Sequence, residues 1–138
     1  MLQQIDVLVV DDRDMEARDT ILGIRYAHAN STITRLKDGE AARDFMFRQG
    51  LFKDRPSILP RLVILELDLP RIHGLELLKQ LRLSQETHEI PVVIFTRNSN
   101  PIAIEEVYAA GASVYLVKPA ERGEYLAEAA RLATRWLA

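Results

Sequence analysis

Polar and charged side chains follow four apolar runs of the chain, each at the point where the run ends. Four of these side chains are carboxylates, one is a hydroxyl and one is an ammonium group. They are Asp11, Asp12, Glu66, Asp68, Thr96 and Lys118. Carboxylates that lie close together repel one another, so such a cluster needs a cation. Mg²⁺, which prefers oxygen ligands, and the Lys118 ammonium are the two cations that this set suggests.

The elements that must position these side chains alternate along the chain. Apolar runs typical of strands cover 5–10, 32–36, 62–67, 91–95 and 113–117, and helical patterns cover 13–28, 38–49, 74–84, 102–110 and 122–137. Continuous runs of Val, Ile and Leu are typical of parallel strands that helices cover on both faces. The pattern predicts an α/β fold with a doubly wound, five-stranded parallel sheet. Ligands of such sheets bind outside the carboxyl ends of the strands, where the six side chains are expected.

Composition excludes several classes of protein. The chain has 138 residues, no cysteine, 18 Lys and Arg, and 20 Asp and Glu, which gives a net charge of −2. One domain with its own core is expected, without a disulfide framework, a zinc ribbon or thiolate chemistry. No basic stripe suggests nucleic acid, and no apolar run reaches the ~18 residues of a membrane span. The first residues do not resemble a signal peptide, so a cytoplasmic location is expected.

The helix predicted over 122–137 has an unusually wide apolar side. One stripe contains Leu126, Ala130, Ala133 and Leu137, and a second contains Tyr125, Leu132 and Trp136. Together they span roughly 160°, whereas docking on one sheet needs ~100°. Two interpretations stay open: the second stripe forms an interface with a partner, or Trp136 folds back on the edge of the sheet.

Four motifs give the chain a resemblance to a known family. They are VVDD (9–12), LVILELDLPRIHG (62–74), VVIFT (92–96) and AAGASVYLVKP (109–119). Together they resemble a response-regulator receiver domain. The segment DGEAARDFMFRQG (38–50), with the long connection after it, is similar to the single-domain receivers that partner phytochromes. The resemblance implies strand order 2-1-3-4-5, two-component phosphorelay signalling, and a histidine kinase of the phytochrome type as partner.

The resemblance also implies roles for single residues. The implied cofactor is Mg²⁺, and the implied ligands are Asp11, Asp12, Glu66 and Asp68, the last through its backbone carbonyl. The switch residues are the hydroxyl of Thr96, the aromatic ring of Tyr115 and the amine of Lys118. The bond between Lys118 and Pro119 is expected to be cis because the family has it so, although cis is the minority form of any X–Pro bond.

Two positions depart from the family pattern. The family has a proline four residues after its acceptor aspartate, and counting back from Pro70 gives Glu66. Glutamate is longer by ~1.5 Å, and a misplacement of ~1 Å can cost about 10²-fold in rate, so efficient phosphorylation is not expected. Arg97 stands after Thr96, where the family has a small residue. Arg97 can cover the site, pair with Glu66 or Asp68, or point into solvent.

These observations predict a degenerate receiver that is a binding module and not an enzyme. One receiver-like domain over residues 1–138, without an effector domain, is expected to act by association. Glu66 either engages Lys118 and Thr96 and holds an active-like state, or the switch is frozen. A homodimer is expected through the face made by 102–110, 113–117 and 122–137. The alternatives are a working Mg²⁺-dependent phosphoacceptor and a Mg²⁺-dependent phosphatase, for which the chain offers no cap segment.

Overall fold

The computed structural model describes residues 5–56 and 58–138. The strands are β1 (Val7–Val10), β2 (Ile33–Leu36), β3 (Leu62–Leu65), β4 (Val92–Thr96) and β5 (Val114–Val117). The helices are α1 (Asp14–Ala27), α2 (Gly39–Phe47), α3 (Gly74–Leu83), α4 (Pro101–Ala109) and α5 (Arg122–Leu137), with the short 3₁₀ helix η1 (Gly50–Phe52).

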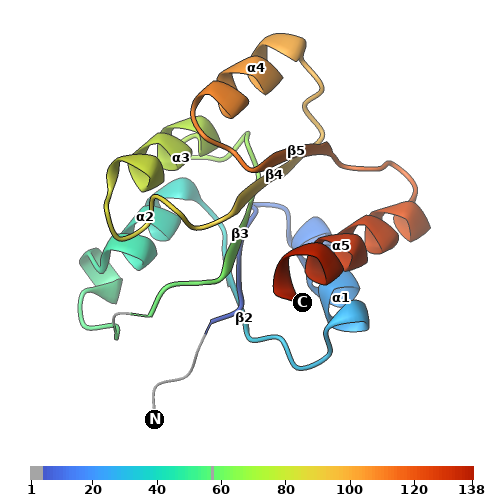
Figure 1. The fold of residues 1–138 in the computed structure, drawn as a ribbon, viewed down its shortest axis with the longest axis horizontal. Helices are drawn as coiled ribbons and strands as arrows, with labels where there is room; N and C mark the ends of the chain where they lie inside the picture. Colours follow the sequence, from blue (N-terminus) through green and yellow to red (C-terminus); the bar gives the residue numbers. More distant parts are fainter. Residues whose placement is uncertain (1–4, 57) are drawn as a thin grey trace.

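One parallel sheet organises the molecule. The strands are ordered β2-β1-β3-β4-β5, and each neighbouring pair is parallel. Helices α1 and α5 cover one face of the sheet, and α2, α3 and α4 cover the other (Figure 1). The predicted doubly wound α/β fold and its strand order are therefore confirmed.

The core consists of one apolar cluster on each face of the sheet. Side chains of β1 alternate between them: Leu8 and Val10 face α2 and α3, whereas Val7 and Val9 face α1 and α5. Every residue of β1 and β3 is buried. This double burial explains why the central strands are continuous apolar runs instead of alternating ones.

Element ends differ from the prediction by a few residues where local contacts decide them. The strand predicted over 62–67 ends at Leu65. Helix α4 begins at Pro101, because the Asn100 side chain accepts a hydrogen bond from the amide of Ile102 and caps the first turn. Among the described residues, no helix has the length and hydropathy needed to cross a membrane.

The predicted interface on α5 is wrong for Tyr125 and Leu132. Both side chains are buried, at 3% and 4% exposure, and Trp136 packs partly buried against the same cluster under the sheet. The apolar side of α5 is wide because this helix packs against α1 as well as the sheet. The two helices approach so closely that a Cβ at Gly23 would lie 2.6 Å from the Cβ of Ala129.

Tyr125 is expected to make the free energy of unfolding decrease at alkaline pH. Its hydroxyl lies 2.8 Å from Oγ1 of Thr20 and 3.1 Å from the carbonyl oxygen of Glu16. Burial raises the pKa of Tyr125 to about 12. A group whose pKa is raised by folding stabilises the fold below its unfolded pKa of about 10, and that contribution is lost as the pH rises through the folded value.

We expect the free energy of unfolding to fall between about pH 10 and pH 12, by about 2 kcal/mol more in the native protein than in Tyr125→Phe. The variant lacks the ionisable hydroxyl, so its decline reports only the other groups that titrate in this range. Urea denaturation of both proteins across this pH range measures the difference. Parallel curves would assign the alkaline loss to groups other than Tyr125.

Candidate functional site

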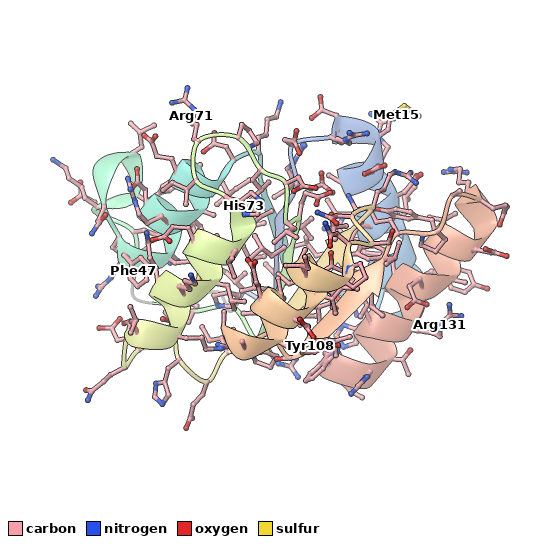
Figure 2. The ribbon with its side chains drawn as sticks, turned by 90° about the horizontal axis from the view of Figure 1, so that it is seen from above. Met15, Phe47, Arg71, His73, Tyr108 and Arg131 are labelled. Atoms are coloured by element: carbon pink, nitrogen blue, oxygen red, sulfur yellow. The ribbon has the colours of Figure 1, made fainter. Side chains whose placement is uncertain are left out.

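The site is built at the carboxyl edge of the sheet, one residue beyond the strands. The amide of Glu66 donates to the carbonyl oxygen of Val10 at 2.9 Å, and the amide of Lys118 donates to that of Thr96 at 2.7 Å. These bonds extend the strand pairing by one residue and place the side chains of Glu66, Lys118 and Asp11 next to one another. The start of α1, marked by Met15, and the segment after β3 lie at the same edge (Figure 2).

The ammonium group of Lys118 is the centre of the site. Its Nζ donates to Oδ2 of Asp11 at 2.7 Å, to Oε1 of Glu16 at 2.6 Å and to Oε1 of Glu66 at 3.0 Å. The Lys118 side chain is fully buried, and the three carboxylate side chains are only 5–13% exposed. An ammonium has three N–H donors, so each of them has a charged acceptor here.

Burial and pairing act in opposite directions on these charges. Burial disfavours the charged form of Lys118, but Asp11 and Glu66 outweigh it and raise the pKa of the ammonium above its usual range. For Asp11, burial outweighs Lys118 and raises the pKa of the carboxyl. Burial also opposes the charge of Glu16, yet Lys118 and Arg97 hold the pKa of that carboxyl below its usual range. The lysine is therefore a fixed positive charge at neutral pH.

The carboxylate that contacts Lys118 belongs to Glu66 and not to Asp68. The second carboxylate oxygen of Glu66 accepts a hydrogen bond from the amide of Asp68 at 3.2 Å. The Asp68 side chain is 58% exposed and lies 3.3 Å from Nε2 of His73. A Cβ at Gly74 would lie 2.6 Å from the carbonyl oxygen of Glu66, so only glycine lets the start of α3 pack against this backbone.

Thr96 is buried at the site but does not engage Glu66 in the way that one hypothesis expected. Its Oγ1 accepts a hydrogen bond from the amide of Asn98 at 3.3 Å. In the described part of the chain, the hydrogen bonds of the Glu66 carboxylate join it to Lys118 and to the amide of Asp68. The hydroxyl of Thr96 therefore organises the loop between β4 and α4 instead of the carboxylate.

Tyr115 also contacts the loop between β4 and α4. Its side chain is 9% exposed, and its hydroxyl donates to the carbonyl oxygen of Asn98 at 2.5 Å. The expected cis bond between Lys118 and Pro119 is wrong: no cis peptide occurs among residues 5–56 and 58–138, so this bond has the trans form that X–Pro bonds ordinarily prefer. Thr96 and Tyr115 thus contact one loop residue from two strands.

Glu16 is the site residue that the sequence analysis missed. It lies in the first turn of α1, five residues after Asp11, and the helix carries it back over the strand ends. Arg97, for which the sequence left three alternatives, donates to Oε2 of Glu16 at 2.7 Å from both Nε and Nη2. An acidic residue in the first turn of a helix that starts directly after Asp11 and Asp12 is the signal that could have found it.

A divalent cation and Lys118 compete for the same oxygens. Carboxylates are the ligands that Mg²⁺ prefers, and oxygens of Asp11, Glu16 and Glu66 lie within 4.8 Å of one another. The Lys118 ammonium, however, sits among these three oxygens, where a Mg²⁺ bound at about 2.0–2.1 Å would overlap it. A metal ion that bound the three oxygens that Lys118 contacts would therefore have to displace the ammonium.

The predicted ligands Asp12 and Asp68 do not belong to this group. Both residues are exposed, and neither contributes a carboxylate oxygen to the cluster of three. The ligand expected of Asp68 is its backbone carbonyl, and that expectation stays a prediction. The structure thus joins two of the four sequence-predicted ligands, Asp11 and Glu66, with Glu16.

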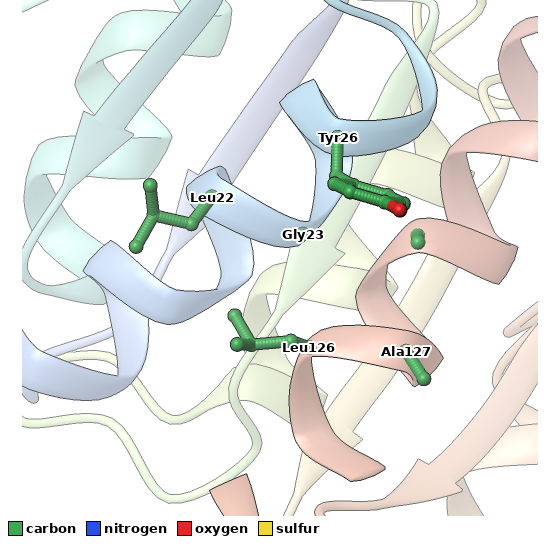
Figure 3. A pocket seen from close by; sticks show the side chains of 6 residues that line it. Leu22, Gly23, Tyr26, Leu126 and Ala127 are labelled. Carbon is green, nitrogen blue, oxygen red and sulfur yellow. The ribbon is translucent and has the colours of Figure 1, made fainter. Parts of the chain in front are cut away.

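A second feature lies between α1 and α5, away from the carboxylates. A hollow of about 530 Å³ is lined by Leu22, Gly23, Tyr26, Leu126, Ala127 and Ala130 (Figure 3). Tyr26 is 90% exposed. Apart from the phenol of Tyr26, this groove offers apolar contact only, without a carboxylate, amine or imidazole. The carboxylate and lysine cluster therefore remains the candidate functional site.

Comparison with known proteins gives a consistent picture. A family model described as the response regulator receiver domain matches residues 7–130. The probable methanogenesis regulatory protein FilR2 of Methanothrix harundinacea is 31% identical over 113 residues, which cover 82% of this chain and 71% of that protein. The response regulator Rcp1 of Synechocystis is 29% identical over 112 residues, which cover 81% of this chain and 75% of that protein.

Solved structures have the same fold. The phosphorylated cyanobacterial phytochrome response regulator RcpA has a TM-score of 0.91 at 21% identity, covering 99% of this chain and 96% of that one. The Mn²⁺-bound form of Rcp1 has a TM-score of 0.85 at 26% identity, covering 96% and 94%. The response regulator RPA3017, in red light signalling of R. palustris, has a TM-score of 0.84 at 27% identity, covering 96% and 94%. RcpA and two further similar structures are described as response regulators of a phytochrome or bacteriophytochrome.

Proposed function

This chain belongs to the response-regulator receiver domain family, and from that premise we propose that it is a degenerate receiver that signals by binding other proteins. Glu66 is the residue that carries this proposal. It stands four residues before Pro70, where the family has its acceptor aspartate, and its carboxylate contacts Lys118 at 3.0 Å. The domain is then a binding module and catalyses no reaction of its own.

The contacts of Glu66 oppose phosphorylation. One carboxylate oxygen is bonded to Lys118 and the other accepts the amide of Asp68, and the residue is 6% exposed. Phosphoryl transfer needs an in-line approach of donor and acceptor with cations on the equatorial oxygens. The acceptor oxygen of a glutamate lies ~1.5 Å further along its side chain than that of an aspartate. A displacement of ~1 Å is enough to cost about 10²-fold in rate.

The same contacts support a fixed state of the switch. The ammonium of Lys118 is already bonded to three carboxylates, and Tyr115 and Thr96 both hold the loop after β4 through Asn98. A side chain that is always present biases a population of states but cannot toggle it.

The proposed partner is a histidine kinase of the phytochrome type. Support comes from the similarity to RPA3017, a response regulator in red light signalling of R. palustris. A bacteriophytochrome response regulator, RtBRR, is also similar, with a TM-score of 0.81 at 28% identity over 99% of this chain and 79% of that one.

Binding to a kinase tests the proposed function. A purified phytochrome-type histidine kinase is immobilised, and the dissociation constant of this protein is measured with and without Mg²⁺ and phosphoramidate. We expect one dissociation constant under both conditions, because the site already holds its charge balance. A change of about tenfold or more on adding the phosphodonor, or no binding to the kinase, would contradict the proposal.

The proposed homodimer uses the face of α4 and β5. This face exposes Ile102, Tyr108 and Val117 to 64%, 48% and 45%. We expect Ile102→Glu to shift the mass measured by light scattering from dimer to monomer, because an apolar contact would then bury an unpaired carboxylate. Leu83→Glu, at a still more exposed position on α3 (86%), is the matched control and should leave the mass unchanged. An unchanged mass in Ile102→Glu removes this face from the interface.

A further inference from the structure

Glu16 joins two cations that come from different parts of the chain. Its Oε1 accepts from Lys118 at the end of β5, and its Oε2 accepts from Arg97, the first residue after β4. The Glu16 side chain is 13% exposed, whereas that of Arg97 is 46% exposed. The guanidinium therefore lies on the solvent side of Glu16, and the ammonium lies beneath it.

The backbone of Glu16 is fixed independently of these ion pairs. Its carbonyl oxygen accepts from Oγ1 of Thr20 at 2.9 Å and from the hydroxyl of Tyr125 at 3.1 Å. Thr20 and Tyr125 are themselves buried. Glu16 thus extends from a rigid contact between α1 and α5, and its carboxylate can act as a fixed anchor for more mobile side chains.

Arg97 links Glu16 to the loop that precedes α4. The amide of Asn98 donates to Oγ1 of Thr96, and the amide of Asn100 donates to Oδ1 of Asn98. Asn100 then caps α4 through the amide of Ile102. The bond from Arg97 to Glu16 is the one charged link between this chain of loop contacts and α1 among the described residues.

We propose that Glu16 is a positioning residue that fastens Lys118 and the loop 97–100 to α1 and so keeps the carboxylates closed to divalent cations and phosphodonors. Lys118 then serves as the resident cation of the cluster, and Arg97 covers it. This inference rests on the proposed function, because it names what holds the site in its single state. It adds that the closed state depends on α1 and not on Glu66 alone.

Amide hydrogen exchange of the loop is the first test, and it needs neither metal nor phosphodonor. We expect Glu16→Gln and Arg97→Gln each to speed exchange at residues 97–100 by about tenfold, the change expected from loss of a charge-assisted hydrogen bond. The double variant should exchange no faster than Glu16→Gln, because that single substitution already removes the contact between Glu16 and Arg97. Arg97→Lys keeps the charge opposite Glu16 and should restore part of the protection.

Asp19→Asn is the matched control. Asp19 is another acidic residue of α1 that pairs with an arginine, Arg122 at 3.1 Å, but it does not touch the carboxylate cluster. Its removal should leave exchange at 97–100 unchanged. Equal exchange in Glu16→Gln and the native protein, or acceleration in Asp19→Asn of the same size, would overturn the proposal.

Access to the site is the second test, made in Glu66→Asp, which restores the residue type of the family. Adding Glu16→Gln should speed labelling by phosphoramidate with Mg²⁺ by about tenfold. If Glu16 were instead a ligand of the metal, the same substitution would slow labelling and raise the Mn²⁺ concentration needed for half-saturation. Labelling of the native protein would count against the proposed function. Unchanged amide exchange at residues 97–100 in Glu16→Gln would count against the role of Glu16 alone.

Discussion

Lys118→Met is expected to lower the free energy of unfolding by about 3–5 kcal/mol, the cost of breaking a buried ion pair by removing one partner. The methionine fills a similar volume but leaves Asp11, Glu16 and Glu66 facing one another without the ammonium that bonds to all three. Domains of this size are commonly stable by only about 5–15 kcal/mol, so much of the stability would be lost. Urea denaturation monitored by circular dichroism measures the change.

Two further variants make this result specific. Lys37→Met removes an exposed lysine whose partner Asp14 is also exposed, and it should change the free energy of unfolding by less than about 1 kcal/mol. Adding Glu66→Gln to Lys118→Met should recover part of the loss, because one of the three facing carboxylates becomes neutral. A loss below about 1 kcal/mol in Lys118→Met would mean that the lysine does not neutralise the cluster.

Glu66→Asp is expected to gain Mg²⁺-dependent incorporation of a phosphoryl group, about 10²-fold above the native protein. The substitution retracts the carboxylate by ~1.5 Å toward the end of β3 and restores the acceptor residue type of the family. Thr96 and Lys118, the two family residues expected to contact the phosphoryl group, are already buried at this edge of the sheet. Incubation with labelled phosphoramidate, followed by quantification of protein-bound label, measures the gain.

Asp68→Asn is the control for this gain of labelling. Asp68 is exposed and its carboxylate lies near His73, so Glu66→Asp with Asp68→Asn should label as well as Glu66→Asp alone. Loss of label in that double variant would identify Asp68 as the acceptor. Absence of label in Glu66→Asp, even with Glu16→Gln added, would mean that the remaining pocket cannot support the chemistry.

The sheet could be predicted because strands that are buried on both faces are continuous apolar runs in the sequence. The residues around Leu8 and Ile64 are apolar at every position. Such runs are typical of a strand that helices cover on both faces. The approach of Asp11, Glu66 and Lys118 followed from topology, since parallel strands place their carboxyl ends at one edge. The count back from Pro70 then separated Glu66 from Asp68.

The contacts of Glu16 and Arg97 depend on tertiary packing and had no local signal of comparable strength. Glu16 lies at the site because α1 packs against α5, which places the first turn of α1 over the strand ends. Arg97 then bonds to the Glu16 carboxylate because the two side chains lie close together. The error on α5 has the same origin. Tyr125 and Leu132 formed a surplus stripe on an isolated helix, but a helix that packs against a sheet and a neighbour needs both stripes.

Intact-protein mass spectrometry of the native chain tests the central claim most directly. The protein is incubated with Mg²⁺ and either phosphoramidate or a phosphorylated phytochrome-type histidine kinase, and any added phosphoryl group is mapped by peptide analysis. We expect the native mass to stay unchanged while Glu66→Asp gains one phosphoryl group. Stoichiometric addition to Glu66 of the native protein would show a working acceptor, and the proposal of a closed, self-neutralised site would be wrong.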